Sequence, residues 1–166
     1  LIAGLLKGVR AAEIVEAIDS IPIMNNADKI VAWFKKNGYV TGIITDSYTI
    51  AAEVITKKLD IDFFAANELI LKNGILTGGI KMPLGWEKIK CSCKISICKR
   101  YHLNQYSIKY GVSNKDTIAI GDTRGDICMI KQAGLGIAFM PKDPDIIKQS
   151  RNIISNPDLN EVLNYM

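Results

Sequence analysis

The sequence predicts an α/β fold in which a parallel sheet carries helices on both faces, together with a β-hairpin. Segments rich in apolar and β-branched residues alternate along the chain with segments of helical periodicity, a pattern typical of strand–helix–strand units. Residues 39–45 form a continuous apolar run, which is typical of a strand buried on both faces. Asn73 and Gly74 separate two further apolar runs and predict a two-residue hairpin turn.

The first half of the chain alternates helices and strands. Residues 11–20 have apolar side chains at helical spacing, and a second helix is expected between a cap at Asn25 or Asn26 and a stop at Asn37-Gly38. The remaining expected elements are a strand over 39–45, a strand-to-helix loop over 45–47, a helix over 48–59, a strand over 61–65 and the hairpin over 68–80.

The second half begins with a segment, residues 81–98, that predicts a surface loop or a short helical turn. A helix is expected over 99–110, ended by Gly111. The following elements are a strand over 117–120, a helix after Asp126, a strand over 135–139, a helix over 143–150, a strand over 152–155 and a closing helix over 157–166 with Pro157 in its first turn.

Composition restricts the class of protein. The 166 residues fit one globular domain with a real core, and 48% of them are hydrophobic. The net charge of +4 is mild and the lysines are scattered, so nucleic-acid binding is not expected. No apolar run is long enough to span a bilayer and no signal peptide is evident, so we expect a cytoplasmic protein without a membrane partner.

The four cysteines do not predict a metal site by their spacing. Cys91, Cys93 and Cys98 lie close together in sequence, whereas Cys128 belongs to a later helix. Zinc sites usually contain Cys-x-x-Cys pairs, and the only histidine, His102, is expected on a helix. Reduced thiols without a metal are therefore the expectation.

Two carboxylates lie where the strand over 117–120 ends. Asp122 follows the strand and Asp126 begins the next helix. Ligands of open α/β sheets gather at the carboxyl ends of strands, and carboxylate oxygens suit Mg²⁺. The residues alone leave two interpretations open, a Mg²⁺ site or a strand end followed by a helix cap.

Thr45 and Lys99 are candidate phosphate ligands. Thr45 ends a strand where a helix is expected to begin, and a hydroxyl beside free backbone N–H groups can bind phosphate. The spacing is equally compatible with a simple helix cap. Taken alone, Lys99 has the pattern of a solvated surface lysine.

These segments together resemble the motifs of the haloacid dehalogenase (HAD) phosphohydrolases, most closely the phosphoserine-phosphatase-like branch. Gly121-Asp122-x-x-x-Asp126 after a hydrophobic strand is similar to the fourth motif of that superfamily. The resemblance implies a Rossmann-like core and a Mg²⁺ cofactor. It also implies that Asp122 binds Mg²⁺ directly and that Asp126 supports the metal or its waters as part of the catalytic apparatus.

The same resemblance extends to two further motifs. Residues 36–48 are similar to the second motif, which assigns Thr45, with Asp46 beside it, to phosphate binding. The distance of Lys99 from Gly121-Asp122 matches the third motif and implies that Lys99 holds both the phosphate and the carboxylate of the nucleophile. Arg100, Lys90 and Lys94 are the alternatives for this role.

The nucleophile of the family, the first aspartate of an Asp-x-Asp-x-Thr sequence, has no counterpart in these residues. Asp60-x-Asp62 and Asp143-x-Asp145 are better interpreted as a turn and a helix cap. The resemblance implies that residues 1–20 are the remnant of a helical cap domain, which covers the active site in the family. It also implies that residues 21–166 are the core domain and that the first strand precedes residue 1. We expect that N-terminal segment as a partner in the middle of the sheet, unless the two neighbouring strands pair directly in a rearranged sheet.

The function implied is Mg²⁺-dependent hydrolysis of a small phosphorylated metabolite through an aspartyl-phosphate, by a protein that is inactive as the 166 residues alone. Asp46 and Ser47 stand where phosphoserine phosphatases usually have two glycines, and Ile2 stands near the position of an arginine that grips the substrate carboxylate; both departures weigh against phosphoserine. The alternatives are a catalytically inactive module that binds a phosphorylated ligand or a protein partner, and a phosphotransferase.

Overall fold

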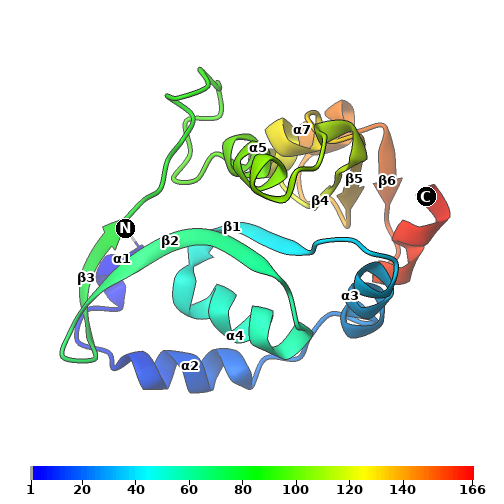
Figure 1. Cartoon of the computed structure of the whole chain (residues 1–166). Coiled ribbons are helices and arrows are strands. Elements are labelled where there is room, and N and C mark those ends of the chain that lie inside the picture. The colour runs from blue at the N-terminus through cyan, green and yellow to red at the C-terminus, as the bar shows by residue number, and fades with distance from the viewer. Residues whose placement is uncertain (1) are drawn as a thin grey trace.

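The structure, a computed structural model, describes residues 2–166 as two three-stranded sheets with helices packed around them (Figure 1). The strands are β1 (Gly42–Tyr48), β2 (Phe63–Lys72), β3 (Ile75–Lys81), β4 (Ile118–Gly121), β5 (Leu135–Phe139) and β6 (Asn152–Ile154). The α-helices are α1 (Ile2–Leu5), α2 (Ala11–Asp19), α3 (Ala27–Lys36), α4 (Thr49–Leu59), α5 (Lys99–Tyr110), α6 (Ile127–Ile130) and α7 (Pro144–Gln149). Three 3₁₀ helices complete the set: η1 (Asn114–Asp116), η2 (Arg124–Asp126) and η3 (Leu159–Tyr165).

The first sheet has the order β1-β2-β3, with β1 parallel to β2 and β2 antiparallel to β3. The predicted hairpin turn is confirmed, because Asn73 and Gly74 have φ angles of 52° and 76°, as a two-residue turn of this kind requires. The strand predicted over 61–65 is present from Phe63, but it does not end at Ala65. It continues into the hairpin as one long strand, β2, because it pairs with β1 at its start and with β3 at its end.

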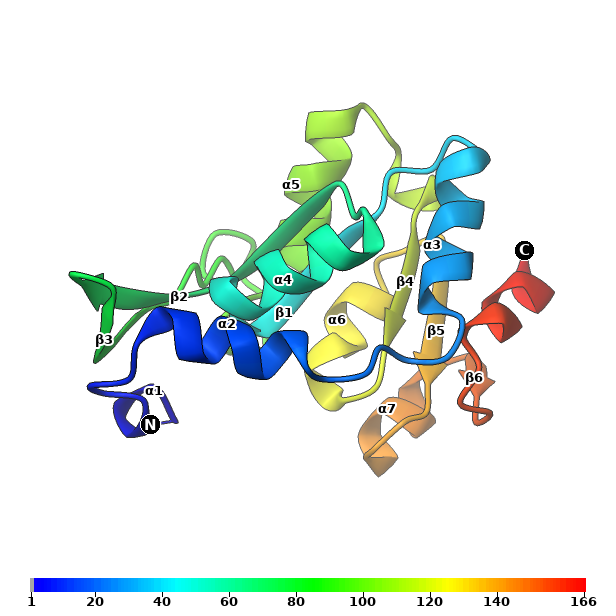
Figure 2. The ribbon, with the colours of Figure 1, turned by 90° about the horizontal axis from the view of Figure 1, so that it is seen from below.

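Helices cover both faces of the first sheet (Figure 2). Helix α4 packs on β1 and β2, and α2 packs on the outside of α4. On the opposite face lies α5, where the ring of Tyr106 stacks on Phe63 with 3.7 Å between centroids. The Tyr106 hydroxyl also donates to the carbonyl of Phe64 at 2.6 Å, which fixes α5 on the strand.

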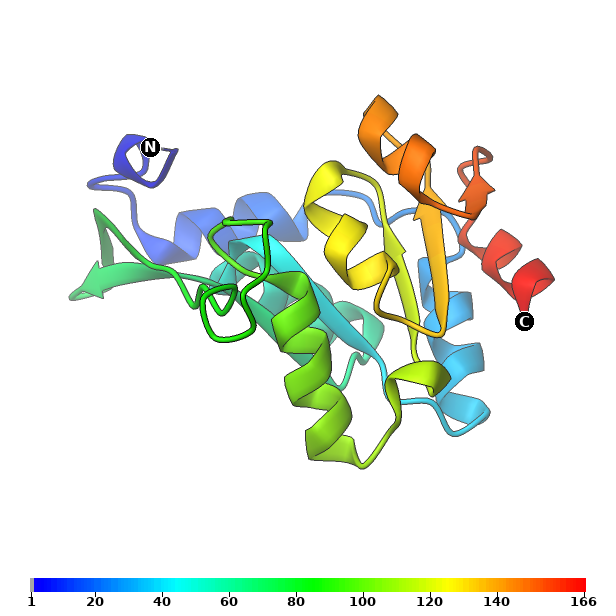
Figure 3. The ribbon, with the colours of Figure 1, turned by 90° about the horizontal axis from the view of Figure 1, so that it is seen from above.

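The second sheet, β4-β5-β6, is entirely parallel and is also covered on both faces (Figure 3). One face packs in a cluster formed by Leu103, Ala119, Met129, Ile130, Ala138 and Ile146, which come from the sheet and from α5, α6 and α7. The other face contributes Ile137, Phe139 and Ile154 to a cluster with Val162 of η3 and Phe34 of α3. The predicted class, parallel strands with helices on both faces, is therefore confirmed.

Helix ends agree with the sequence in most places. Gly111 ends α5 with φ of 67°, and the carboxylate of Asp143 caps α7 by accepting from the backbone of residues 145 and 146. Asn26 is the N-cap residue of α3, one of the two predicted positions, but its side chain makes no cap hydrogen bond and donates instead to Asp158 at 2.9 Å. The closing segment is the 3₁₀ helix η3 rather than an α-helix.

The N-terminal helices pack against the hairpin. Ala3 is buried together with Leu69 and Leu76 of the hairpin strands. The expected division into a cap remnant (1–20) and a core (21–166) stays a prediction, and Leu1 lies outside the described residues. Within the part of the chain that the structure describes, no helix is both long and apolar enough to cross a bilayer.

A cavity of about 730 Å³ separates the two sheets. Its lining is largely apolar and comes from both facing strands and from the helices beside them, including Ile30, Ile43, Ile44, Leu103, Ile118, Ala119 and Ile120. Over residues 2–166, β1 pairs only with β2, and β4 only with β5. The alternative in which β1 and β4 pair directly in a rearranged sheet is therefore wrong.

Candidate functional site

The loop after β4 is organised around the carboxylate of Asp126. The residue is 2% exposed, and its Oδ2 accepts the backbone N–H groups of Asp122 (3.1 Å) and Thr123 (3.0 Å) and the hydroxyl of Thr123 (3.1 Å). Gly121 is required at the strand end, because a Cβ there would collide with the Asp126 side chain. The loop is thus wrapped around one buried anion.

Lys99 neutralises that anion. It is the first residue of α5, it is 8% exposed, and its Nζ forms an ion pair and a hydrogen bond with Asp126 Oδ1. The alternatives are placed elsewhere: Arg100 donates to the carbonyl of Ile89 at 3.3 Å, and Lys90 and Lys94 are exposed. Lys99 is therefore the one of these four basic side chains that pairs with Asp126 in the loop after β4.

Asp122 lies above this pair, where solvent can reach it. Its side chain is 38% exposed, and Oδ2 accepts from Lys142 Nζ at 2.5 Å. The hydrogen bond and charge of Asp122 raise the pKa of Lys142. Lys142 was not predicted, although it follows β5, the parallel neighbour of β4, and strand ends of parallel neighbours meet at one edge.

Asp143 ties the loop after β4 to the loop after β5. Its Oδ2 accepts the backbone N–H of Arg124 at 2.7 Å, while Oδ1 caps α7. Hydrogen bonds from the backbone of Ile146 and Arg124 lower the pKa of Asp143. The prediction of a helix cap is confirmed, and the second hydrogen bond makes Asp143 a support of the site as well.

Thr45 does not lie at a helix N-terminus, so that expectation is wrong. Strand β1 continues to Tyr48, and α4 begins at Thr49. Ile44 pairs with Ala65 and Tyr48 with Asn67, so residues 45–47 bulge from the ladder opposite a single residue. Within the bulge, Thr45 Oγ1 accepts the backbone N–H of Ser47 at 3.1 Å.

Asn67 holds this bulge in place and was missed from the sequence. It is 1% exposed, and its Nδ2 donates to the carbonyl of Asp46 at 2.6 Å and to Ser96 Oγ at 2.9 Å. Its Oδ1 has no partner among the described residues. The signal in the sequence is an asparagine inside an apolar strand, since a buried amide needs hydrogen-bond partners.

The predicted site residues therefore form two groups. Lys99, Asp122 and Asp126 are joined by direct hydrogen bonds at the end of β4. Thr45 and Asp46 belong to β1, and Asn67 links the backbone of Asp46 to Ser96 in the segment before α5. That both groups act on one phosphate stays a prediction.

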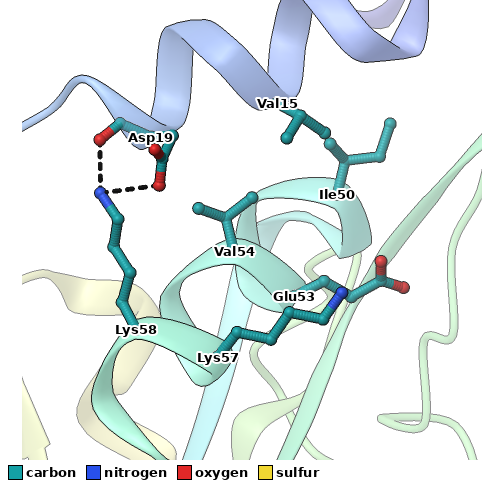
Figure 4. A pocket seen from close by; sticks show the side chains of 7 residues that line it. All are labelled: Val15, Asp19, Ile50, Glu53, Val54, Lys57 and Lys58. Atoms are coloured by element: carbon teal, nitrogen blue, oxygen red, sulfur yellow. Dashed lines mark hydrogen bonds and ion pairs between the residues drawn. The ribbon is translucent and has the colours of Figure 1, made fainter.

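A second hollow, of about 370 Å³, lies between α2 and α4 (Figure 4). Its walls are Val15, Asp19, Ile50, Glu53, Val54, Lys57 and Lys58. Lys58 pairs with Asp19 at 3.0 Å across the two helices. The lining of this hollow includes none of the strand-end residues, so we interpret the hollow as a gap in the packing of the two helices.

The donors at the β4 end suit a hard cation. Within the described residues, Asp122 Oδ1 has no partner, whereas both oxygens of Asp126 already accept hydrogen bonds. Carboxylate oxygens are the ligands that Mg²⁺ prefers. Asp122 is thus placed to bind such a cation directly, and Asp126 to orient the loop behind it.

Comparison with known proteins places the chain in a family. Residues 1–131 match the model of the haloacid dehalogenase-like hydrolases. The chain is 35% identical over 163 residues to the phosphoserine phosphatase of Methanocaldococcus jannaschii, covering 98% of this chain and 72% of that protein. It is 28% identical over 160 residues to the phosphoserine phosphatase of Haemophilus influenzae, covering 96% of this chain and 48% of that protein.

Solved structures agree. A phospho-aspartyl intermediate analogue of phosphoserine phosphatase superposes with a TM-score of 0.83 at 32% identity, covering 99% of this chain and 74% of that one. A substrate-bound phosphoserine phosphatase gives a TM-score of 0.83 at 31% identity, covering 99% and 73%. The chain therefore belongs to the haloacid dehalogenase-like hydrolases, in their phosphoserine-phosphatase-like branch, and these relatives support the predicted enzyme class, a HAD-type phosphatase.

Proposed function

We propose that the protein is a Mg²⁺-dependent phosphomonoester hydrolase that acts on a small phosphorylated metabolite through an aspartyl-phosphate. The aspartate would lie outside these 166 residues. The observation that carries the proposal is the buried pair of Lys99 and Asp126 beneath the accessible carboxylate of Asp122. A fixed cation and a metal-binding carboxylate at one strand end are two of the parts that phosphoryl transfer requires.

Lys99 would bind the transferring phosphoryl group. An ammonium group has three N–H donors. Among the described residues Lys99 Nζ donates only to Asp126, so two donors remain for a phosphate oxygen and the carboxylate of the nucleophile. Because Asp126 and the start of α5 fix this ammonium group, it would stabilise charge in the transition state with little rearrangement.

Asp122 would hold Mg²⁺, with Asp126 supporting the loop that presents it. When bound, Mg²⁺ would neutralise negative charge on the phosphate oxygens. Lys142 now occupies one oxygen of Asp122, but its side chain is 71% exposed. A pair this exposed contributes about 0–1 kcal/mol, so a divalent cation can displace it.

Thr45 and Asp46 would complete the substrate side. Thr45 Oγ1 accepts a hydrogen bond from the N–H of Ser47. The hydroxyl proton of Thr45 therefore remains available to donate to a phosphate oxygen. The carboxylate of Asp46 is exposed, while its backbone is fixed by Asn67. Asp46 would therefore contact the leaving group of the substrate rather than the phosphate itself.

An N-terminal segment of the same protein would occupy the cavity between the sheets and carry the nucleophile. Strands β1 and β4 each pair in parallel with one neighbour, and over residues 2–166 their facing edges have no strand partner. The walls between them are largely apolar. Each buried backbone group without a partner costs about 1–3 kcal/mol. A central parallel strand would pair both edges, and without it the 166 residues would be inactive.

The test uses the complete protein with an aryl phosphate and a panel of phosphomonoesters. Asp122→Asn should abolish Mg²⁺-dependent hydrolysis, because it removes the charge that binds the metal. Asp28→Asn, an exposed aspartate on α3, is the matched control and should retain full activity. Equal activity of the two variants would refute the proposal.

A second function, a catalytically inactive module that binds a phosphorylated ligand, is favoured by one observation. Asp46 and Ser47 shape the β1 end as a bulge where the family usually has two glycines. Titration calorimetry with inorganic phosphate, beside the activity panel, separates the two functions. Phosphate binding that depends on Lys99 but is accompanied by no hydrolysis would establish the module.

A further inference from the structure

All four cysteines of the chain converge on one point. Cys91, Cys93 and Cys98 come from the segment before α5, and Cys128 comes from α6. Their four sulfur atoms all lie within 4.8 Å of one another. Cys91 and Cys98 are buried, the other two are half-buried, and all four are free thiols. The spacing of the cysteines along the sequence does not predict this cluster, because Cys128 reaches the other three through the packing of α6 against α5.

The backbone around the cluster adopts an unusual conformation. Lys90 and Lys94, which flank the Cys91-x-Cys93 pair, have φ angles of 49° and 46°. Left-handed conformations at residues other than glycine cost on the order of 1–3 kcal/mol, and they mark sites where the surroundings impose a shape. The left-handed residues Lys90 and Lys94 enclose residues 91–93, and this shape brings the thiols of Cys91 and Cys93 to the same point.

Further hydrogen bonds fix the rest of the segment. The N–H of Cys91 donates to the carbonyl of Trp86, and the N–H of Cys98 to that of Leu84, both at 2.8 Å. Leu84 also forms a β-bridge with Ile97, which is fully buried. The thiols are therefore carried by a loop that backbone hydrogen bonds close.

Backbone N–H groups point at the sulfur atoms. Cys91 accepts from the backbone of Cys93, Cys98 from that of Tyr101, and Cys128 from that of Arg100. Donors of this kind stabilise the charged thiolate, which is the form of cysteine that binds a metal.

We propose that Cys91, Cys93, Cys98 and Cys128 bind one Zn²⁺ ion as a structural site. Zn–S bonds of about 2.3 Å in a tetrahedron place the sulfur atoms about 3.8 Å apart, so contraction by about 1 Å from the widest present separation is enough. Four cysteine ligands leave no position for water or substrate, which is the arrangement of structural rather than catalytic zinc.

The charge around the cluster fits this assignment. Zn²⁺ with four thiolates carries two net negative charges, and the segment supplies cations in Lys88, Lys90, Lys94 and Arg100. A cluster that binds several irons needs more space between its ligands than a single ion, so one tetrahedral metal is the better fit.

The zinc site would connect the two segments that carry Lys99 and Asp126. Cys98 immediately precedes Lys99, and Cys128 is the second residue after Asp126. One ion bound to both would therefore fix the start of α5 against the metal loop. This assignment does not depend on the substrate or on the phosphatase activity.

The experiment measures metal content in the complete protein, purified under reducing conditions without a metal-chelating tag. We expect one zinc per chain by elemental analysis, and its loss in Cys91→Ser and Cys128→Ser. Ser92→Ala is the matched control, because Ser92 lies between two ligands but is exposed, and it should retain the zinc. Replacement of zinc by Co²⁺ should give the sulfur-to-cobalt charge-transfer bands and intense visible bands of a tetrahedral thiolate site.

Three results would overturn the proposal. The first is a wild-type protein that contains no zinc and forms no tetrahedral cobalt complex, a test that does not require the cysteine variants to fold. The second is a disulfide among these cysteines in the reduced preparation, found by mass spectrometry. The third is stoichiometric iron in place of zinc.

Discussion

The two sheets line the same cavity, but their strand ends are stabilised by different chemistry. At the end of β4 a buried carboxylate, Asp126, accepts the loop N–H groups and is neutralised by Lys99. At the end of β1 a buried amide, Asn67, donates to the backbone of Asp46. The first arrangement fixes a pair of charges at the strand end, whereas the second fixes only the conformation of the backbone.

The largest difference between the two sides should appear in stability. Asp126→Asn leaves the ammonium of Lys99 buried without its counter-ion, and loss of one partner of such a pair costs about 3–5 kcal/mol. Asn67→Ala removes neutral hydrogen bonds and should cost about 1–3 kcal/mol. Urea unfolding of the complete protein measures both. Equal losses would show that the charged side is held no more strongly than the neutral one.

Two glycines allow the same comparison through packing. A Cβ at Gly134, before β5, would collide with the backbone carbonyl of Lys115, whereas one at Gly42, at the start of β1, would collide with the ring of Phe63. Overpacking costs about 1–3 kcal/mol, and a ring can move where a backbone cannot. Thermal unfolding should therefore show a larger loss for Gly134→Ala than for Gly42→Ala. The reverse order would mean that the first sheet is the more rigid.

The sequence predicted the β4 side better than the β1 side, for a physical reason. Gly121, Asp122 and Asp126 act within one short loop, so their spacing carries the geometry. The shape of the β1 end depends on Asn67 of the neighbouring strand, and no local pattern in residues 45–47 encodes it. A strand-to-helix loop was therefore expected where the chain forms a bulge.

The same distinction explains the elements. Helices and the hairpin are specified by local signals such as Gly111 and Asn73-Gly74, and these were predicted correctly. Features that depend on distant contacts were missed, namely the length of β2, the pairing of Lys142 with Asp122, and the meeting of Cys128 with the other cysteines. Spacing along one segment cannot reveal a partner that packing brings from another.

Acid should weaken both sheets through two carboxylates that the structure stabilises in ionised form, Asp62 at the start of β1 and β2 and Asp143 after β5. Burial raises the pKa of Asp62, but hydrogen bonds from Thr41 and Lys35 outweigh it and leave the pKa below its ordinary value. Hydrogen bonds from Ile146 and Arg124 lower the pKa of Asp143. A depressed pKa contributes stability above the unfolded-state value, and this contribution is lost as the pH falls below about 4.

Asn substitutions separate the two contributions. Asp62→Asn and Asp143→Asn should each reduce the dependence of unfolding free energy on pH below about 4, and each should cost less at neutral pH than Asp126→Asn. Only Asp143→Asn should also weaken the activation of the enzyme by Mg²⁺, because Asp143 holds the backbone of Arg124 in the loop after β4. An equal effect of Asp62→Asn on that response would show that the two sides are coupled.

The smallest expected effect concerns the one contact that competes with the proposed metal. Lys142 Nζ lies 2.5 Å from Asp122 Oδ2 but is 71% exposed, so the pair contributes about 0.2–1 kcal/mol. Mg²⁺ must displace this contact, and Lys142→Ala should therefore lower the Mg²⁺ concentration needed for half-maximal activity by about 1.4- to 5-fold. Lys148→Ala, an exposed lysine on α7, is the control and should leave that concentration unchanged. A higher Mg²⁺ requirement in Lys142→Ala would mean that Lys142 assists the site, by binding a phosphate oxygen once the metal has taken Asp122.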